Sequence, residues 1–259
     1  MVLRALVESP AEPTMKELAD RLNLPLSTMH RLLEMLCEQG FAERDESTRA
    51  FRPGVEFFRV ASLVVNRTSV RAAAKPFLVA AAEETGESAY LCAFDARAGK
   101  LMFVANAEST HLLSYRVPMD TPFSITVGAS GLSILAWLPE QQREDIIRNE
   151  TLSGGPPVGN LDIAKLHKTL ASVRAKGFAH TFGQRIKGAV GLFAPVFNAS
   201  GEVIASFGVT VPEVRYRPTA LPSLTASVVH QALALSRALG YMQPVVDSRY
   251  GKSARRTQS

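Results

Sequence analysis

A short polar stripe made of Ser27, Thr28 and Arg31 lies on one side of a segment whose apolar residues repeat with helical spacing. Arginine can donate two hydrogen bonds to O6 and N7 of guanine, and threonine can contact a thymine methyl group or a phosphate. Side chains at the start of a helix in the major groove meet base edges. The stripe therefore predicts a DNA-reading helix, with a solvated polar face as the alternative. His30 beside it could be a phosphate contact or a partly buried spacer.

The segments around this stripe predict a helix-turn-helix. Thr14 and Glu17 have the spacing of a capping box, and an apolar stripe at helical spacing follows them as far as Asn23. Pro25 suits the first turn of the next helix, and Gly40 supplies a left-handed C-terminal cap to it. Two short amphipathic helices joined by such a short turn are typical of this motif.

Two strand-like segments, residues 41–44 and 50–52, flank a polar run and predict a hairpin, which would be the wing of a winged helix. Its arginines could reach phosphates or the minor groove, and these are Arg44, Arg49 and Arg52. Alternatively, the first two only offset the charge of the acidic residues next to them.

Net charge is a weak indicator here. The chain has a formal net charge of +5, but residues 1–76 hold 11 Lys and Arg against 10 Asp and Glu, and residues 243–259 are a basic tail that is expected to be disordered. The two cysteines, Cys37 and Cys92, form no metal-spaced cluster and are expected to be reduced thiols.

No apolar run is long enough to span a bilayer, and no secretory signal is evident, so we expect a cytoplasmic protein. We expect no cofactor and no metal.

The rest of the chain alternates helices with hairpins. Residues 55–66 are expected to form an apolar helix that packs against a partner chain or the first helix. Further helices are expected at 71–85, 128–137, 139–149, 161–176 and 218–239. Strands are expected at 88–94, 101–108, 112–117, 179–182, 191–197 and 203–211. This order predicts an antiparallel sheet flanked by helices, and an α+β chain overall.

The segment TMKELADRLNLPLSTMHRLLEMLCEQGFAERDESTRAFRPG resembles the DNA-binding module of the IclR family of bacterial regulators. The likeness continues in family order through KPFLVAAAEETGESAYLCAFDARAGKLMFV, TVGASGLSILAWLPE and VRAKGFAHTFGQRIKGAVGLFAPVFNASGEVIASFGVTVP. It covers roughly residues 1–240. The resemblance implies a GAF-like α/β effector domain, homodimers or homotetramers on operator DNA, and control by a small organic acid or aromatic metabolite.

The resemblance also implies an effector pocket. Polar groups common in members with small-acid ligands are replaced at several positions, and phenylalanines lie near them in sequence, which favours an aromatic or larger ligand over a two-carbon acid. Arg185 could bind a ligand carboxylate, or it could be a surface arginine on a loop. The expected effector contacts are Met119, Phe123, Gly128, Ala129, Ser130, Thr181, Arg185, Gly191, Phe193, Gly208 and Thr210.

The chain departs from the family pattern in its wing. Members commonly carry glycine where this chain has Arg49, and a basic residue where it has Ala50. The wing contacts are therefore less firmly expected than those of the helix. The family's first helix usually begins about ten residues before the position of Met1, so the chain is expected to start late or to be shortened.

We expect four parts: a winged helix-turn-helix domain at 1–54, a linker helix at 55–69, an effector-binding domain at 70–242 and a disordered tail at 243–259.

Two other functions are alternatives to a ligand-controlled regulator. An enzyme would need a nucleophile, but Ser130 lies in GASG and not in a G-x-S-x-G elbow, and the histidines form no metal-binding pattern. The third possibility is a DNA-binding regulator whose C-terminal domain only oligomerises.

Overall fold

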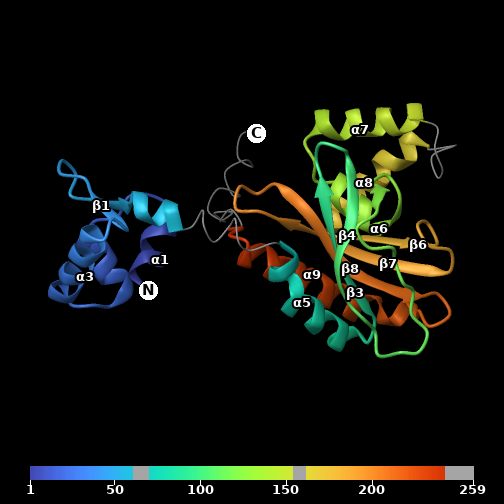
Figure 1. The fold of residues 1–259 in the computed structure, drawn as a ribbon, viewed down its shortest axis with the longest axis horizontal. Helices are drawn as coiled ribbons and strands as arrows, with labels where there is room; N and C mark the ends of the chain where they lie inside the picture. The colour runs from blue at the N-terminus through green and yellow to red at the C-terminus, as the bar shows by residue number, and fades with distance from the viewer. Residues whose placement is uncertain (61–69, 154–161, 243–259) are drawn as a thin grey trace, which may run out of the picture. The chain divides into compact units, whose positions relative to one another are not determined.

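The computed structural model describes residues 1–60, 70–153 and 162–242. The chain divides into two compact units, Met1–Ser69 and Val70–Ser259, which are described separately (Figure 1). Much of the expected linker at 55–69 and the whole expected tail at 243–259 lie outside the described residues. Among the helices that are described, none is long and apolar enough to cross a membrane.

The first unit is a small three-helix module with a hairpin. Its elements are α1 (Val2–Val7), α2 (Met15–Leu22), α3 (Leu26–Glu38), β1 (Ala42–Arg44) and β2 (Phe51–Pro53). The two strands pair antiparallel, and Arg44 lies opposite Phe51. Apolar residues of all five elements form one core, in which Leu18, Met29 and Leu33 are fully buried.

Local signals set the ends of these helices. The Thr14 hydroxyl accepts a hydrogen bond from the Glu17 amide, and the Glu17 carboxylate accepts one from the Thr14 amide, so the predicted capping box is confirmed. Asn23 ends α2 in the left-handed conformation, with φ 51°. Pro25 is the N-cap of α3, one residue before the predicted position. Gly40 has φ +71°, as its predicted C-cap role requires.

The hairpin turn is held by Asp45. Its carboxylate accepts hydrogen bonds from the Ser47 hydroxyl and from the Ser47 and Thr48 amides. These bonds, that of the Ser47 hydroxyl first, keep the pKa of Asp45 well below its ordinary value. Arg49 closes the turn in the left-handed conformation, with φ 58°. A non-glycine residue in that region is conformationally costly, which fits the expectation that glycine is the more usual residue there.

The second unit is a six-stranded antiparallel sheet between two layers of helices. The strand order is β5-β4-β3-β8-β7-β6. The strands are β3 (Ser88–Asp95), β4 (Lys100–Ala107), β5 (Pro122–Ser124), β6 (Ala179–Phe182), β7 (Ala189–Phe197) and β8 (Val203–Pro212). The helices are α5 (Val70–Thr85), α6 (Gly128–Leu135), α7 (Glu140–Ser153), α8 (Ile163–Lys176), the 3₁₀ turn η1 (Pro218–Ala220) and α9 (Leu221–Ala238).

Each face of the sheet has its own core. Helices α5 and α9 pack on one face, around Leu78, Phe207 and Val228. Helices α6, α7 and α8 belong to the core on the other face, around Phe103, Leu135 and Leu170 (Figure 1). Strand alternation produces this separation, because neighbouring residues on a strand point to opposite faces. The predicted α+β fold is confirmed.

One predicted strand is absent. Residues 112–117 form no strand, and the edge of the sheet beside β4 is instead β5, whose Phe123 pairs with Leu101. The 112–117 segment is held by other bonds: the Tyr90 hydroxyl donates to the Tyr115 carbonyl, and the Arg215 guanidinium donates to the Leu113 carbonyl. Side-chain donors therefore satisfy carbonyl groups that a neighbouring strand would otherwise pair.

Candidate functional site

The first candidate site is the outer face of α3. Met29 and Leu33 are buried in the core. Ser27, His30 and Arg31 are exposed, while Thr28 is half-buried. The predicted polar stripe therefore lies on the free side of the helix. Within the described residues, Arg31 makes no ion pair or side-chain hydrogen bond, so its guanidinium is available to a partner.

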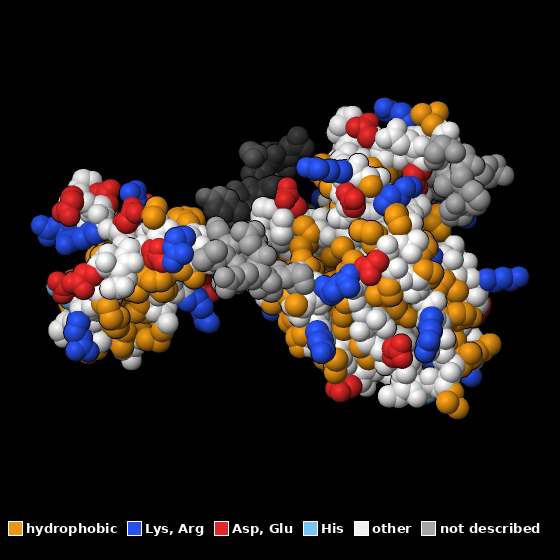
Figure 2. All heavy atoms as spheres, in the orientation of Figure 1, with side chains coloured by type: hydrophobic (Ala, Val, Ile, Leu, Met, Phe, Trp, Pro, Cys, Tyr) orange, Lys and Arg blue, Asp and Glu red, His pale blue; other side chains and the backbone are white. Residues whose placement is uncertain are grey.

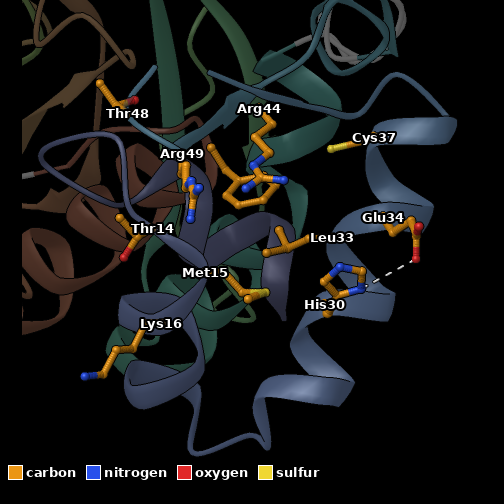
Figure 3. Close-up of a pocket in the computed structure, with 11 residues that line it drawn as sticks. Thr14, Met15, Lys16, His30, Leu33, Glu34, Cys37, Arg44, Thr48 and Arg49 are labelled. Carbon is orange, nitrogen blue, oxygen red and sulfur yellow. Dashed lines mark ion pairs between the residues drawn. The ribbon is translucent and has the colours of Figure 1, made fainter. Parts of the chain in front are cut away.

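A groove of about 540 Å³ separates α3 from the hairpin. Met15, Leu33 and Phe51 contribute apolar surface to it, and its polar lining includes Lys16, His30, Arg44 and Arg49 (Figure 3). Helix and hairpin thus present basic side chains around one concave surface. Figure 2 shows positive and negative side chains mixed over the surface in view.

The three hairpin arginines differ in their contacts. Arg52 forms an ion pair with Glu43, its partner on the opposite strand, at 3.0 Å. The Arg44 guanidinium lies 5.9 Å from the centre of the Phe51 ring. Within the described residues, neither Arg44 nor Arg49 forms an ion pair. This geometry disfavours the alternative in which the two arginines only offset the charge of neighbouring acidic residues. His30 is more exposed than a buried spacer would be, with its Nδ1 3.6 Å from a Glu34 carboxylate oxygen.

The second candidate site is a cavity in the C-terminal unit, between the start of α6 and the ends of β6, β7 and β8. Eight of the expected effector contacts line it: Gly128, Ala129, Ser130, Thr181, Arg185, Gly191, Phe193 and Thr210. The start of α6 is fixed by the segment around β6, because the Thr181 hydroxyl accepts from the Ala129 amide and the Gln184 side chain accepts from the Gly128 amide.

Arg185 is the one charged side chain in this lining, as far as the described residues go. It donates hydrogen bonds to the carbonyls of Ser124 and Val127, and its guanidinium lies 5.1 Å from the centre of the Phe123 ring. Its Nε is buried and has no hydrogen-bond partner within the described residues. Burial lowers the pKa of Arg185 from its ordinary value. In this conformation the guanidinium of Arg185 is turned inward, so Arg185 is not a surface arginine that points to solvent.

Three expected contacts do not line the cavity. Met119 and Phe123 pack against the core of the same face, and Phe123 reaches the site only through its contact with Arg185. A Cβ atom at Gly208 would lie 2.1 Å from the Leu192 carbonyl oxygen, so this glycine accommodates the neighbouring strand.

The cavity is smaller than expected. Its open space is about 30 Å³, which is roughly the volume of one water molecule. The expectation of a roomier pocket is therefore not met in this conformation.

Sequence reasoning missed five lining residues, namely Phe103, Val117, Gln184, Ile186 and Ala189. Two of them, Gln184 and Ile186, flank Arg185 in the segment between β6 and β7, and the position of Arg185 is the signal that could have included them. Phe103 lies on β4, next to a register shift in its pairing with β3, and nothing in its sequence neighbourhood indicates that its ring reaches the cavity.

In the part of the chain that is described, no cluster of three or more His, Cys, Asp or Glu could hold a metal ion. Burial raises the pKa of the Cys92 thiol to about 12, which leaves it protonated and a poor nucleophile at neutral pH.

A helix-turn-helix with a hairpin wing, joined to a separate sheet unit that encloses a cavity, defines the class of winged helix-turn-helix transcription regulators. Family models agree: residues 1–46 match the IclR helix-turn-helix domain, and residues 62–237 match the bacterial transcriptional regulator IclR C-terminal domain. The chain belongs to the IclR family, and its N-terminal unit is the family's DNA-binding module.

Individual relatives are similar over most of their length. The HTH-type transcriptional regulator BhcR of Paracoccus denitrificans is 30% identical over 223 residues, which are 86% of this chain and 79% of that protein. The transcriptional repressor IclR of Escherichia coli is 24% identical over 93% of this chain and 88% of its own length. The crystal structure of Pseudomonas aeruginosa HmgR matches with a TM-score of 0.77 at 25% identity, and the match covers 93% of this chain and 95% of that one.

Proposed function

We propose that this protein is a cytoplasmic, ligand-responsive transcription regulator that binds operator DNA as a homodimer or homotetramer. The observation that carries the proposal is the pairing of two features in one chain. One is a DNA-binding module with an unpaired Arg31 on its free helix face, and the other is a separate unit whose cavity contains a half-buried Arg185 with a buried, unbonded Nε. Regulation is favoured over catalysis because the relatives are transcription regulators.

In the proposed complex, the start of α3 enters the major groove. Arg31 contacts a guanine, Ser27 and Thr28 contact bases or phosphate, and Arg44 and Arg49 contact the sugar-phosphate backbone. The remaining proposed contacts, His30 and Arg52, lie at the edge of this surface, and Arg52 must first leave Glu43 to take part.

Self-association is supported by the residues after the wing. Residues 55–60 are helical, and Val55 and Phe58, three residues apart on one side of this helix, are 75% and 62% exposed. Apolar side chains at this spacing form one surface, and a second chain could cover it. A dimer would present two copies of α3 to a two-fold symmetric operator.

The function is tested by a mobility-shift titration of the purified full chain against the DNA upstream of its own gene, with and without candidate ligands. We expect a sequence-preferring complex at moderate salt that contains at least two protomers per duplex, and whose affinity changes with an active ligand. A complex that unrelated competitor DNA displaces as readily as operator DNA would contradict the proposal.

The proposed ligand is an organic carboxylate, most simply an aromatic one. Arg185 is the partner, because its Nε has no bond and its other bonds are to neutral carbonyls. A carboxylate that accepts two hydrogen bonds from one guanidinium is a strong and oriented pairing. The aromatic preference rests on the phenylalanines beside the arginine, Phe103 and Phe193, whose ring centres lie 6.4 Å apart. Entry of a ring requires the cavity to enlarge, because its open space is about 30 Å³.

We expect an aromatic carboxylate that binds to raise the melting temperature of the chain by several degrees, because a ligand at a hundred times its Kd stabilises a protein by about 2.7 kcal/mol. The corresponding amide should give no shift. Arg185→Met, measured against its own ligand-free melting temperature, should abolish the shift. Lys187→Met, which removes an exposed cation from the same segment, is the matched control and should keep it.

The opposite result is equally informative. If no carboxylate in a broad aromatic and aliphatic panel stabilises the protein while operator binding is intact, the C-terminal unit only oligomerises. The small open space of the cavity is the observation that favours this second candidate.

A further inference from the structure

Glu34 continues the DNA-facing stripe of α3. Residues 27, 31 and 34 have the spacing i, i+4 and i+7, which places their side chains along one side of a helix. All three are exposed, and Met29 and Leu33 on the opposite side are buried. Any surface that contacts Ser27 and Arg31 therefore lies close to Glu34 as well.

Glu34 is also the one acidic side chain that lines the groove between α3 and the hairpin, within the part of the chain that is described. The cationic and titratable groups that share the lining are Lys16, His30, Cys37, Arg44 and Arg49. Figure 3 shows Glu34 and His30 one turn apart on α3, and the arginines on the hairpin side. A carboxylate here repels a phosphate backbone that the neighbouring cations attract.

The carboxylate has a use only where DNA offers a donor. An ionised carboxylate accepts hydrogen bonds and donates none. In the major groove the donors are the amino groups of cytosine N4 and adenine N6, whereas guanine O6 and thymine O4 are acceptors. Glu34 therefore gains a bond from one set of bases and is repelled by the other.

His30 lies one turn before Glu34 on α3. Its Nδ1 lies 3.6 Å from a Glu34 oxygen, and both side chains are largely exposed, at 62% and 60%. An exposed contact of this length is weak, so the Glu34 carboxylate is available to a base.

We propose that Glu34 is a specificity-determining residue, which selects operators that present the amino group of a cytosine or adenine beside the base read by Arg31. The proposal rests on the proposed docking of α3 in the major groove. Glu34 then discriminates between operator sequences by repulsion as well as by attraction.

The test is selection from a pool of randomised duplexes with the purified full chain, followed by sequencing of the bound DNA. The variants are Glu34→Ala and Glu38→Ala, because alanine removes both the charge and the acceptor oxygens. Glu38 is exposed one turn further along α3 and does not line the groove, so it removes the same charge at a site without the proposed contact. Both substitutions are on the surface, and both variants should fold.

The wild-type pool should be enriched in cytosine or adenine at a defined position. Glu34→Ala should lose about tenfold of that preference and bind an unselected duplex more tightly, since one good side-chain contact supplies roughly that discrimination. Glu38→Ala should keep the preference. An enriched wild-type pool with the same preference in Glu34→Ala overturns the role of Glu34 alone. A wild-type pool without enrichment overturns the proposed DNA docking itself, and the role of Glu34 with it.

Discussion

Replacing Gly208 with alanine is expected to destabilise the C-terminal unit by about 3 kcal/mol. Gly208 lies in the middle of the sheet, opposite Tyr90 on β3 and Phe193 on β7. An added Cβ would meet the Leu192 carbonyl oxygen at 2.1 Å and the Phe193 ring at 2.5 Å. The carbonyl belongs to a paired strand, so the contact cannot be relieved by a rotamer change. Urea denaturation, followed by circular dichroism, measures the loss.

Gly191→Ala is the matched control. Gly191 is also in the sheet, on β7, but an added Cβ there would lie 3.3 Å from the Ala129 Cβ and 3.6 Å from the Thr181 hydroxyl. These neighbours are side chains, and a shift of a few tenths of an ångström relieves the closest contact. We expect a loss below about 1 kcal/mol and weaker ligand binding, because Gly191 lines the cavity. Equal losses of stability in both variants would contradict the explanation from the strand contact.

The fold of the first unit could be predicted in detail because its signals are local. Thr14 and Glu17 cap each other over three residues, and Gly40 needs a left-handed conformation that few other residues tolerate. The same is true of the polar stripe on α3, since helical spacing alone assigns its face. Arg49 shows the limit of local signals. The sequence marks it as an unusual residue for this turn, but its φ of 58° depends on the geometry of the hairpin.

Features of the second unit that depend on contacts distant in sequence were predicted less well. The 112–117 segment has the apolar pattern of a strand, but its carbonyls are bonded to Tyr90 and Arg215 side chains, which are remote in the chain. Gly208 was assigned to the pocket because of its place in a matching motif. Its actual role depends on the register of β7 against β8, which sequence spacing does not specify.

The cavity illustrates the same point for a binding site. Motif positions identify eight lining residues, but they do not give the volume of the cavity, which depends on side-chain conformations. Whether Arg185 points to solvent or to the carbonyls of Ser124 and Val127 depends on a loop between strands. The resemblance locates that loop but does not give its side-chain conformations.

Arg31→Ala is expected to weaken operator binding by about 1–3 kcal/mol, a five- to 150-fold rise in Kd, if this side chain reads a guanine. The residue is exposed on the free side of α3, so its removal should leave the stability of the module unchanged within about 0.5 kcal/mol. The measurement is fluorescence anisotropy with a labelled operator duplex, together with a randomised duplex as the non-specific reference. The expected loss is specific: operator binding should fall much more than binding to the reference.

Two further variants separate base reading from charge. Arg31→Lys keeps the positive charge but loses the planar pair of donors, so it should restore non-specific binding and leave most of the operator preference lost. Arg44→Ala removes a proposed phosphate contact on the hairpin and should weaken both duplexes alike, with the slope of log K against log salt reduced by about one. If Arg31→Lys binds the operator as well as the wild type does, Arg31 contributes only charge, and the reading of bases falls to Ser27, Thr28 and Glu34. The contrast between Arg31 and Arg44 therefore decides whether α3 reads the operator or only holds it.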